Sequence, residues 1–380
     1  MSFEEFVDKM KNIQIILLEF LEDESDAEDK YENLINLIST LNIINVQYEF
    51  KALLKLMNTI SSFHQRGPNF ISKNERLLRH FKNDIQKYFS NSEIFEIFKL
   101  NMRIHLFLIE EKIMTIDEYV FSQIIIDQDC IDKKYLEYFQ PEIRPFLTEE
   151  NIEKYGSKNK ILKDDKFIEK MKKEVDKDFY EKRREGERDD YLCELIRFNK
   201  IEEFITFTEQ RNLPLDSEIK SSIFETNLLL DDEYEIKLIE YASFYGSNDV
   251  IKYLQMKGVK FTSFMWIYAI HSKNAELIQY LENNHVSQPD DIIEIPVMCH
   301  HNEILNYIID NLIKEEDLQD DIECIFQNAI EYHNYCFFPT KKKCKNMLLY
   351  LCECDDIELI KLLLEEGDID INATIRTSII

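Results

Sequence analysis

Glycine and proline are scarce in this chain. The 380 residues include only 6 glycines and 7 prolines, the residues on which many tight turns and phosphate-binding loops depend. The glycines stand singly, so neither the P-loop nor the dinucleotide-binding fingerprint is present, and nucleotide-dependent catalysis is not expected. Apolar residues recur at helical spacing in segments such as 13–21 and 51–57. The sequence therefore predicts an all-α protein of helices joined by short polar links.

Signals for secretion and for membrane insertion are also missing. The N-terminal residues 1–8 contain acidic side chains, without the basic start and apolar core of a signal peptide. Nowhere does a run of about 18 apolar residues occur, as a membrane-spanning helix would need. We therefore expect a soluble, cytoplasmic protein without membrane insertion. In that compartment its 8 cysteines are expected to be reduced thiols rather than a disulfide framework.

An excess of positive charge is missing as well, because 74 acidic residues outnumber 46 Lys and Arg residues. The formal net charge is −28 and is spread along the chain, a field that repels phosphate backbones and anionic membranes. Basic residues cluster only at 182–184 and at 341–345, and both clusters are interpreted as solvated connections. The sequence therefore predicts no nucleic-acid partner. Its acidic surface favours a protein partner with a basic face.

The chain divides into three parts of different character. Residues 1–157 predict an α-helical leader domain, either a bundle or further degenerate repeats. Charge dominates in residues 158–190, which predict a linker that is mobile or an exposed charged helix; we favour a partly helical linker. Residues 191–380 contain internal repeats.

The repeats are visible as a 13-residue pattern. Segments that begin at Ala242, Ala269 and Pro296 align at an offset of 27, and outlying copies begin at Leu195 and Leu351. Each copy predicts a short helix, a polar turn that tolerates positive φ, and an amphipathic helix. One such hairpin cannot bury its own apolar face, so the copies are expected to stack as a solenoid.

The pattern resembles the ankyrin repeat. Segment 358–372 is similar to the close of an ordinary ankyrin unit, whereas the period of 27 is shorter than the usual 33 or so and no Thr-Pro-Leu-His opening occurs. Segments 222–227, 238–247, 268–278 and 299–304 together resemble an uncharacterised, divergent ankyrin domain of large protein families in parasitic protists, over roughly residues 190–330. Segments 66–70, 88–95 and 108–113 resemble the helical leader of such proteins. The resemblance implies an ankyrin-like helical repeat solenoid with shortened fingers, and protein binding by analogy.

The resemblance also implies a binding surface. Ankyrin arrays bind partners through the two positions just before each inter-helix turn, and aromatic, Met and Arg side chains are enriched in interface hot spots. The alternative is that Phe244 and Met298 belong to the core. The candidate protein-binding residues are Arg197, Phe198, Phe244, Tyr245, His271, Ser272, Met298, Cys299, Glu353 and Cys354.

Few residues of the chain form patterns typical of catalysis or metal binding. Cys299, His300 and His301 lie in a row, with His333, Cys336 and Cys344 downstream, but only His333 and Cys336 have the spacing of a zinc ligand pair. No nucleophile motif surrounds any Ser or Cys. The acidic pairs 231–232, 290–291 and 320–321 are interpreted as solvated surface charge. We expect no catalytic residue, no metal and no cofactor.

These observations favour a non-enzymatic scaffold or adaptor. Two alternatives stay open: the leader is the functional module and the repeats a tether, or the chain is a metal- or cysteine-dependent enzyme. Trp266, the single tryptophan, is expected to pack between repeats with its N–H bonded to a carbonyl. The chain stops soon after the last copy without a polar capping repeat, so we expect a frayed end. Neither partner, pathway nor oligomeric state follows from the sequence.

Overall fold

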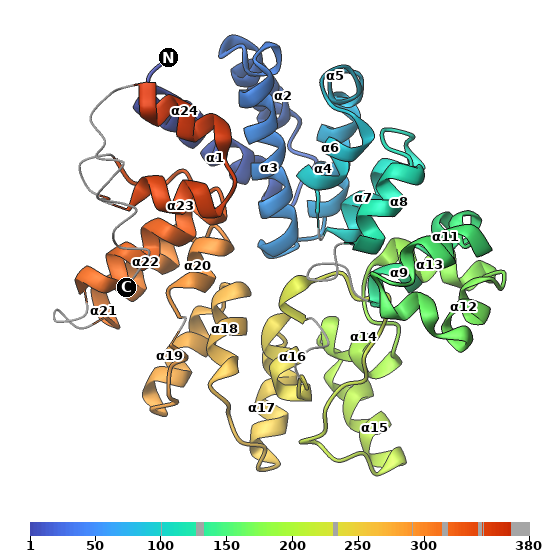
Figure 1. Cartoon of the computed structure of the whole chain (residues 1–380). Helices are drawn as coiled ribbons and strands as arrows, with labels where there is room; N and C mark the ends of the chain where they lie inside the picture. Colours follow the sequence, from blue (N-terminus) through green and yellow to red (C-terminus); the bar gives the residue numbers. More distant parts are fainter. Residues whose placement is uncertain are drawn as a thin grey trace. The chain divides into compact units, whose positions relative to one another are not determined.

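The computed structural model describes residues 1–99, 101–126, 133–230, 235–290, 292–313, 318–340, 344 and 346–365. In these ranges the regular structure consists of α-helices and short 3-10 helices (Figure 1). The one β feature there is an isolated bridge between Glu218 and Lys237. The prediction of an all-α protein is confirmed.

The chain forms two compact units. Unit 1 comprises residues 1–74, 243–246 and 261–380, and unit 2 comprises residues 75–242 and 247–260. The helices of unit 1 are α1 (Phe3–Leu21), α2 (Glu28–Thr40), α3 (Gln47–Phe63), α18 (Phe264–His271), α19 (Ala275–Asn283), α20 (Glu294–Met298), α21 (Asn302–Asn311), α22 (Leu318–Glu331), α23 (Met347–Glu353) and α24 (Ile357–Glu365). Those of unit 2 are α5 (Lys82–Tyr88), α6 (Asn91–Ile97), α7 (Met102–Glu110), α8 (Glu118–Ile126), α9 (Lys133–Tyr138), α10 (Gln140–Ile143), α11 (Glu149–Tyr155), α12 (Asp165–Met171), α13 (Lys177–Glu185), α14 (Tyr191–Arg197), α15 (Ile201–Arg211) and α17 (Asn248–Met256). Helices α4 (Phe70–His80) and α16 (Leu238–Phe244) contribute to both units.

The N-terminal helices share the core of the C-terminal repeats. A capping box of Ser2 and Glu5 starts α1, and apolar residues at helical spacing, among them Phe6, Ile13 and Phe20, are buried along one face. Within unit 1, α1 packs against α2, α3 and α24, and α3 packs against α20. Figure 1 shows the blue helix α1 beside the red helix α24, and α3 beside the orange helix α20. The compact units therefore do not follow the boundaries at 157 and 190 that the sequence suggested, and that three-part division stays a prediction.

The repeats share one backbone turn. In the copy that starts at Ala269, the N–H of Lys273 donates to the carbonyl of Ile270 at 3.1 Å, and the N–H of Asn274 donates to that of Ala269 at 3.0 Å. Lys273 adopts a left-handed conformation with φ of 51°. These paired bonds close a helix in the manner of a Schellman turn, so the polar turn predicted in each copy is a helix stop.

The same turn occurs in copies that the sequence alignment included and in copies that it missed. The equivalent left-handed residues have φ between 48° and 66° and repeat the two hydrogen bonds; they are Asn199, Gly246, His300 and Asp355 in the aligned copies, and Lys112 and His333 in two further turns. The turn at His333 follows α22, and the turn at Lys112 follows α7. This helix-stop turn therefore also occurs in the segment predicted as the leader.

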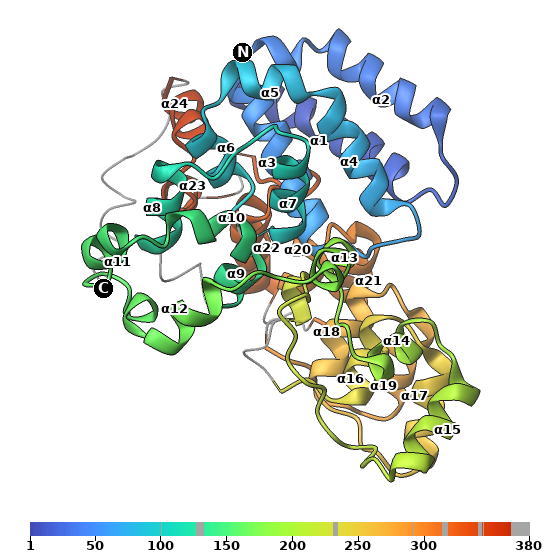
Figure 2. The same ribbon diagram turned by 90° about the vertical axis from the view of Figure 1, so that its right-hand side faces the viewer.

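The turns join helices that pack as pairs. Helices α14 and α15 pack together in unit 2, and α18 with α19, α20 with α21, and α23 with α24 in unit 1. Figures 1 and 2 both show α18 beside α19. Along unit 1, α18 contacts α20, α20 contacts α22, and α22 contacts α23. Successive first helices of the repeats thus stack on one another.

Residues 158–190 are partly helical. Helices α12 and α13 lie in this segment, and the side chain of Arg183 in α13 is 3% exposed. Arg183 donates two hydrogen bonds to the carboxylate of Glu142 at 2.7 and 2.9 Å, and one to the carbonyl of Tyr138 at 3.1 Å. This charged segment is therefore anchored within unit 2.

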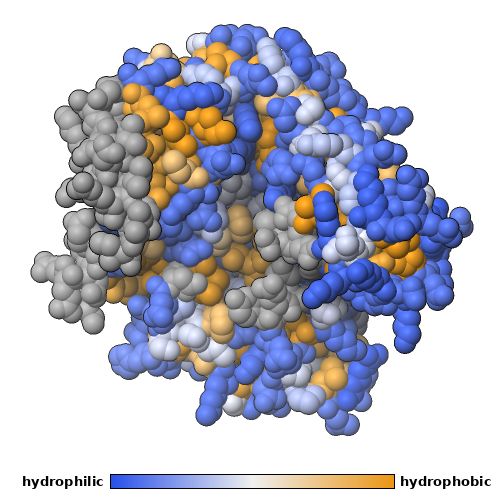
Figure 3. Space-filling view, in the orientation of Figure 1, coloured by the Kyte–Doolittle hydropathy of each residue, from blue (hydrophilic) through white to orange (hydrophobic). Residues whose placement is uncertain are grey.

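The surface and the single tryptophan match their composition-based expectations. Hydrophilic residues cover much of the face seen in Figure 3, with hydrophobic residues in patches between them. Trp266 is buried, and its indole N–H donates to the carbonyl of Val286 at 3.1 Å, as predicted. Of the helices in the described ranges, none combines the length and the apolar content that crossing a bilayer requires.

Candidate functional site

Half of the predicted binding residues are buried. Phe244, His271, Ser272, Met298 and Cys299 are at most 8% exposed, so they cannot contact a partner in this structure. Those that reach solvent are Phe198 and Glu353, which are exposed, and Arg197, Tyr245 and Cys354, which are partly buried. Phe244 and Met298 belong to the core, as the alternative interpretation predicted.

The physical reason for this burial is packing by aromatic rings and by the N-terminal helices. The rings of Phe244 and His271 stack with centroids 4.0 Å apart. Beside Cys299, the Nδ1 atom of His64 lies 2.7 Å from the cysteine's carbonyl oxygen. His64 caps the C-terminus of α3, a helix outside the aligned repeats. Tertiary packing between segments far apart in sequence thus removes part of the predicted surface from solvent.

A groove of about 680 Å³ opens instead between α1 and the helices α19 and α21. Its apolar lining includes Ile15 and Leu18 of α1, Ile278 of α19, and Ile304 and Tyr307 of α21. Ile15 is 41% exposed and Tyr307 is 40% exposed. Ile15 and Leu18 lie beside the buried stripe of α1, so this helix has apolar side chains in the core and in the groove.

Acidic residues outnumber the one lysine among the residues that line the groove. Glu19, Glu22 and Glu303 line it, with Lys273 as the cation among its lining residues. Lys273 forms an ion pair with Glu22. The Nε2 atom of His64 lies 3.0 Å from the same carboxylate. Burial would raise the pKa of Glu22, but hydrogen bonds from His64 and Lys273 outweigh it and lower the pKa to about 2. Glu22 is therefore ionised at neutral pH.

His64 faces two acceptors. Its Nδ1 meets the carbonyl of Cys299 and its Nε2 meets the carboxylate of Glu22. These two contacts link the end of α1, the end of α3 and the turn after α20.

The other histidines near the groove are neutral. Burial lowers the pKa of His271 and His300 to about 3, and lowers that of His301 well below its ordinary value. His300 Nδ1 lies 2.9 Å from the side-chain amide of Gln14, and His301 Nε2 lies 3.0 Å from the carbonyl of His271. These side chains connect neighbouring turns and α1, as expected of structural histidines.

Burial works against activation of several thiols. Burial raises the pKa of Cys193 to about 12, that of Cys344 and Cys354 to about 11, and also that of Cys299, whereas a nucleophilic cysteine needs a lowered pKa. Across the described residues, no three or more His, Cys, Asp and Glu side chains gather in a way that could hold a metal ion. The enzyme hypothesis gains no support from these groups.

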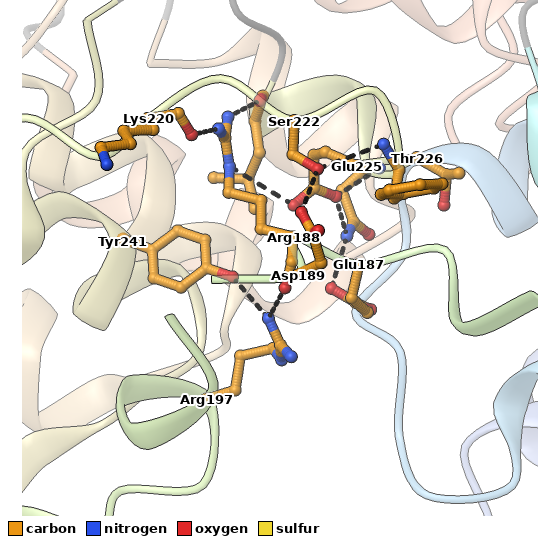
Figure 4. A network of polar contacts seen from close by, with 12 residues as sticks. Glu187, Arg188, Asp189, Arg197, Lys220, Ser222, Glu225, Thr226 and Tyr241 are labelled. Atoms are coloured by element: carbon orange, nitrogen blue, oxygen red, sulfur yellow. Dashed lines mark hydrogen bonds and ion pairs between the residues drawn. The ribbon is translucent and has the colours of Figure 1, made fainter. Parts of the chain in front are cut away.

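A second polar cluster lies in unit 2. Arg188, 2% exposed, donates to the carbonyl of Leu230 at 2.8 Å and lies 3.6 Å from the carboxylate of Glu225 (Figure 4). Burial raises the pKa of Glu225, and the nearby negative charge of Glu187 adds to this effect, so that the pKa is about 7. Arg197 donates to the carbonyl of Arg188 at 2.8 Å. The cluster ties the segment before α14 to the loop before α16, so it is best understood as a structural anchor.

Some predicted features lie outside the described residues. They include the pair 231–232, residue 291 of the second acidic pair, the side chain of residue 320, most of the basic cluster at 341–345, and the chain end at 366–380.

The groove itself could not be foreseen from the alignment of repeats. Its first wall belongs to α1, more than 250 residues before α19 in the sequence. The sequence contained one signal for it: the apolar residues of segment 13–18 cover a wider part of the helix surface than a single buried face requires. Comparisons with protein-family models, with curated proteins and with solved structures found no match for this chain.

Proposed function

We propose that this chain is a non-enzymatic protein-binding scaffold or adaptor, and that its binding surface is the groove between α1, α19 and α21. The observation that carries the proposal is the exposure of apolar side chains in a concave site. Ile15 and Tyr307 are 41% and 40% exposed there. Apolar side chains gathered in a depression favour association, because covering them removes apolar surface from water.

The proposal includes an ankyrin-like arrangement of the repeats. Three polar side chains at or just after the left-handed turn reach a backbone carbonyl of the preceding copy. Ser247 Oγ donates to Ile196, His301 Nε2 lies 3.0 Å from the oxygen of His271, and Asn334 Nδ2 donates to Val297 at 3.0 Å. Such nearest-neighbour bonds are consistent with the stacking that a repeat array requires.

The leader and the repeats both contribute to the proposed surface. Helix α1 supplies one wall, and α19 and α21 supply the others. A leader that acts alone, with the repeats as a tether, would not need this shared groove. A cytoplasmic location belongs to the proposal as well, supported by the free state of every cysteine in the described residues.

The test is partner capture with matched variants. The chain and the double variant Ile15→Gln and Tyr307→Gln are used as baits in lysate of the source cell, and prey are identified by mass spectrometry. The control is Met256→Gln with Ile357→Gln, since these residues are also exposed and apolar, at 78% and 55%, but do not line the groove. Circular dichroism verifies that all baits are folded.

A prey that binds the chain and the control but not the groove variant supports the proposal. Prey that bind all baits equally would contradict it. If the prey are lost instead with the variants Phe198→Ala and Tyr245→Ala, the turn positions that reach solvent are the binding surface.

A further inference from the structure

We propose that the occupant of the groove is a basic amphipathic helix of a partner protein. This inference rests on the proposed function and adds the chemical class of the partner. It follows from the charge of the groove, the spacing of its apolar side chains and the secondary structure around it.

Charge is the first argument. Three carboxylates line the groove, those of Glu19, Glu22 and Glu303, against one ammonium group. That ammonium group, on Lys273, is already paired with Glu22, and the neighbouring imidazoles of His300 and His301 are neutral because burial lowers their pKa. The groove thus presents unbalanced negative charge around an apolar floor. Lys and Arg side chains at the edge of a bound segment would complement it.

Spacing is the second argument. Ile15, Leu18, Glu19 and Glu22 stand at i, i+3, i+4 and i+7, so they share one face of α1. This face is about 10 Å long, or two helical turns. Opposite it, Ile304 and Tyr307 have the i, i+3 spacing on α21. Side chains of a helix with apolar residues at i, i+3, i+4 and i+7 can pack between such rows.

The surrounding secondary structure favours a helical over an extended occupant. One common way for an extended peptide to bind a protein is to add a strand to the open edge of a sheet. In the described ranges the chain has no sheet, only the isolated bridge between Glu218 and Lys237 in unit 2. A helix satisfies its own backbone hydrogen bonds, so it needs only side-chain contacts with the groove.

The ion pair of Lys273 and Glu22 shows how a basic partner would be accommodated. The side chains of Lys273 and Glu22 are 37% and 42% exposed, so a partner's cation can approach the Glu22 carboxylate and take the place of Lys273. The His64 contact with Glu22 at 3.0 Å would keep this carboxylate in position during the exchange.

The experiment is a selection from a display library of random peptides of about 16 residues, roughly four helical turns. Peptides are selected on the full chain and counter-selected on the Ile15→Gln, Tyr307→Gln variant, which alters the apolar lining without changing charge. The affinity of the enriched peptides is then measured by fluorescence anisotropy at low and high salt.

We expect the enriched peptides to carry net positive charge and apolar residues at i, i+3, i+4 and i+7. Glu19→Gln with Glu303→Gln should weaken their binding about fivefold, in the range of two partly exposed ion pairs, and raising the salt concentration should also weaken it. The control pair Glu202→Gln and Glu209→Gln, exposed on α15, should leave the affinity unchanged.

The outcomes separate the two proposals. Groove-dependent peptides without net positive charge, or with binding unaffected by Glu19→Gln and Glu303→Gln, would overturn the basic partner and leave the groove as a binding surface. If no peptide distinguishes the chain from the Ile15→Gln, Tyr307→Gln variant, the groove is not a binding surface and the proposed function fails as well.

Discussion

At the scale of single residues, buried polar side chains connect segments that are distant in sequence. Gln14 of α1 is fully buried and its amide donates to the side-chain oxygen of Asn334 at 2.8 Å, while it also lies 2.9 Å from His300 Nδ1. Removing one partner of a buried hydrogen bond leaves the other unsatisfied, which costs about 1–3 kcal/mol. Such hydrogen bonds favour one position of α1 on the turns against which it packs.

Arg188 offers the sharpest test at this scale. Its guanidinium group is buried and donates to the carbonyls of Lys220 and Leu230. We expect Arg188→Ala to lower the free energy of unfolding of unit 2 by about 3–5 kcal/mol, because it leaves the buried carboxyl group of Glu225 and the buried carbonyl of Leu230 without the guanidinium group. Urea unfolding followed by circular dichroism measures the change.

The matched control is Arg184→Ala, four residues away. Arg184 is 61% exposed and pairs with Glu110 on the surface, so its loss should cost less than about 1 kcal/mol. Equal effects of the two variants would mean that the Arg188 network does not anchor unit 2.

At the scale of elements, the left-handed turn residue sets where each hairpin bends. A residue with a Cβ atom in this conformation costs about 1–2 kcal/mol relative to right-handed geometry, whereas glycine adopts it freely. Gly246 has φ of 66°, and a Cβ atom placed there meets nothing closer than 3.9 Å, so backbone conformation alone decides the effect of a substitution. Lys112 has φ of 56° at the equivalent position of its hairpin.

This contrast predicts opposite effects of two substitutions. Gly246→Ala should reduce the free energy of unfolding by about 1 kcal/mol, and Lys112→Gly should increase it by about the same amount. Denaturant titration of both variants provides the measurement. Glu111→Gly, one position earlier and with φ of −79°, should destabilise the protein. If Lys112→Gly lowers the free energy of unfolding instead, the left-handed conformation of Lys112 does not destabilise the folded protein.

At the scale of the whole molecule, buried titratable groups make stability depend on pH. Burial lowers the pKa of His271, His300 and His333 to about 3, against an ordinary value of 6.5. Because the folded pKa lies below the unfolded pKa, their contribution to stability is complete above about pH 6.5 and is lost as the pH falls toward 3. Glu22, with a pKa lowered from 4.5 to about 2, acts in the same direction at lower pH.

Glu225 acts in the opposite direction. Its pKa is raised from 4.5 to about 7, so its contribution is complete below about pH 4.5 and is lost as the pH rises through 7. Because a titration of the whole protein sums both trends, a comparison between variants is needed to separate them.

We expect His333→Asn to reduce the acid sensitivity of the protein. Asn tolerates the left-handed conformation at this turn but does not titrate. As the pH falls from about 6.5 to 4, the free energy of unfolding of the variant should therefore decrease less steeply than that of the unmodified chain, by up to about 1.4 kcal/mol per pH unit. Urea midpoints measured across this range test the expectation. Parallel curves for the two proteins would show that His333 is not held neutral by burial.

The sequence by itself determined the helical class, the repeat pattern and the turn between paired helices. These are local properties, because helical spacing of apolar residues and the chemistry of a turn act within about 30 residues. Even so, the copy that ends at His333 was missed, since its turn is followed by the irregular segment 334–340 rather than by an α-helix.

Only the tertiary structure decided which repeat positions face solvent and where a groove forms. Docking of α1 and α3 brings His64 to Cys299 and Gln14 to His300 and Asn334, and this surrounds residues that the repeat pattern alone places at a surface. Exposure depends on what packs against a residue from elsewhere in the chain, and periodicity contains no such information. The candidate site accordingly belongs to helices far apart in the sequence.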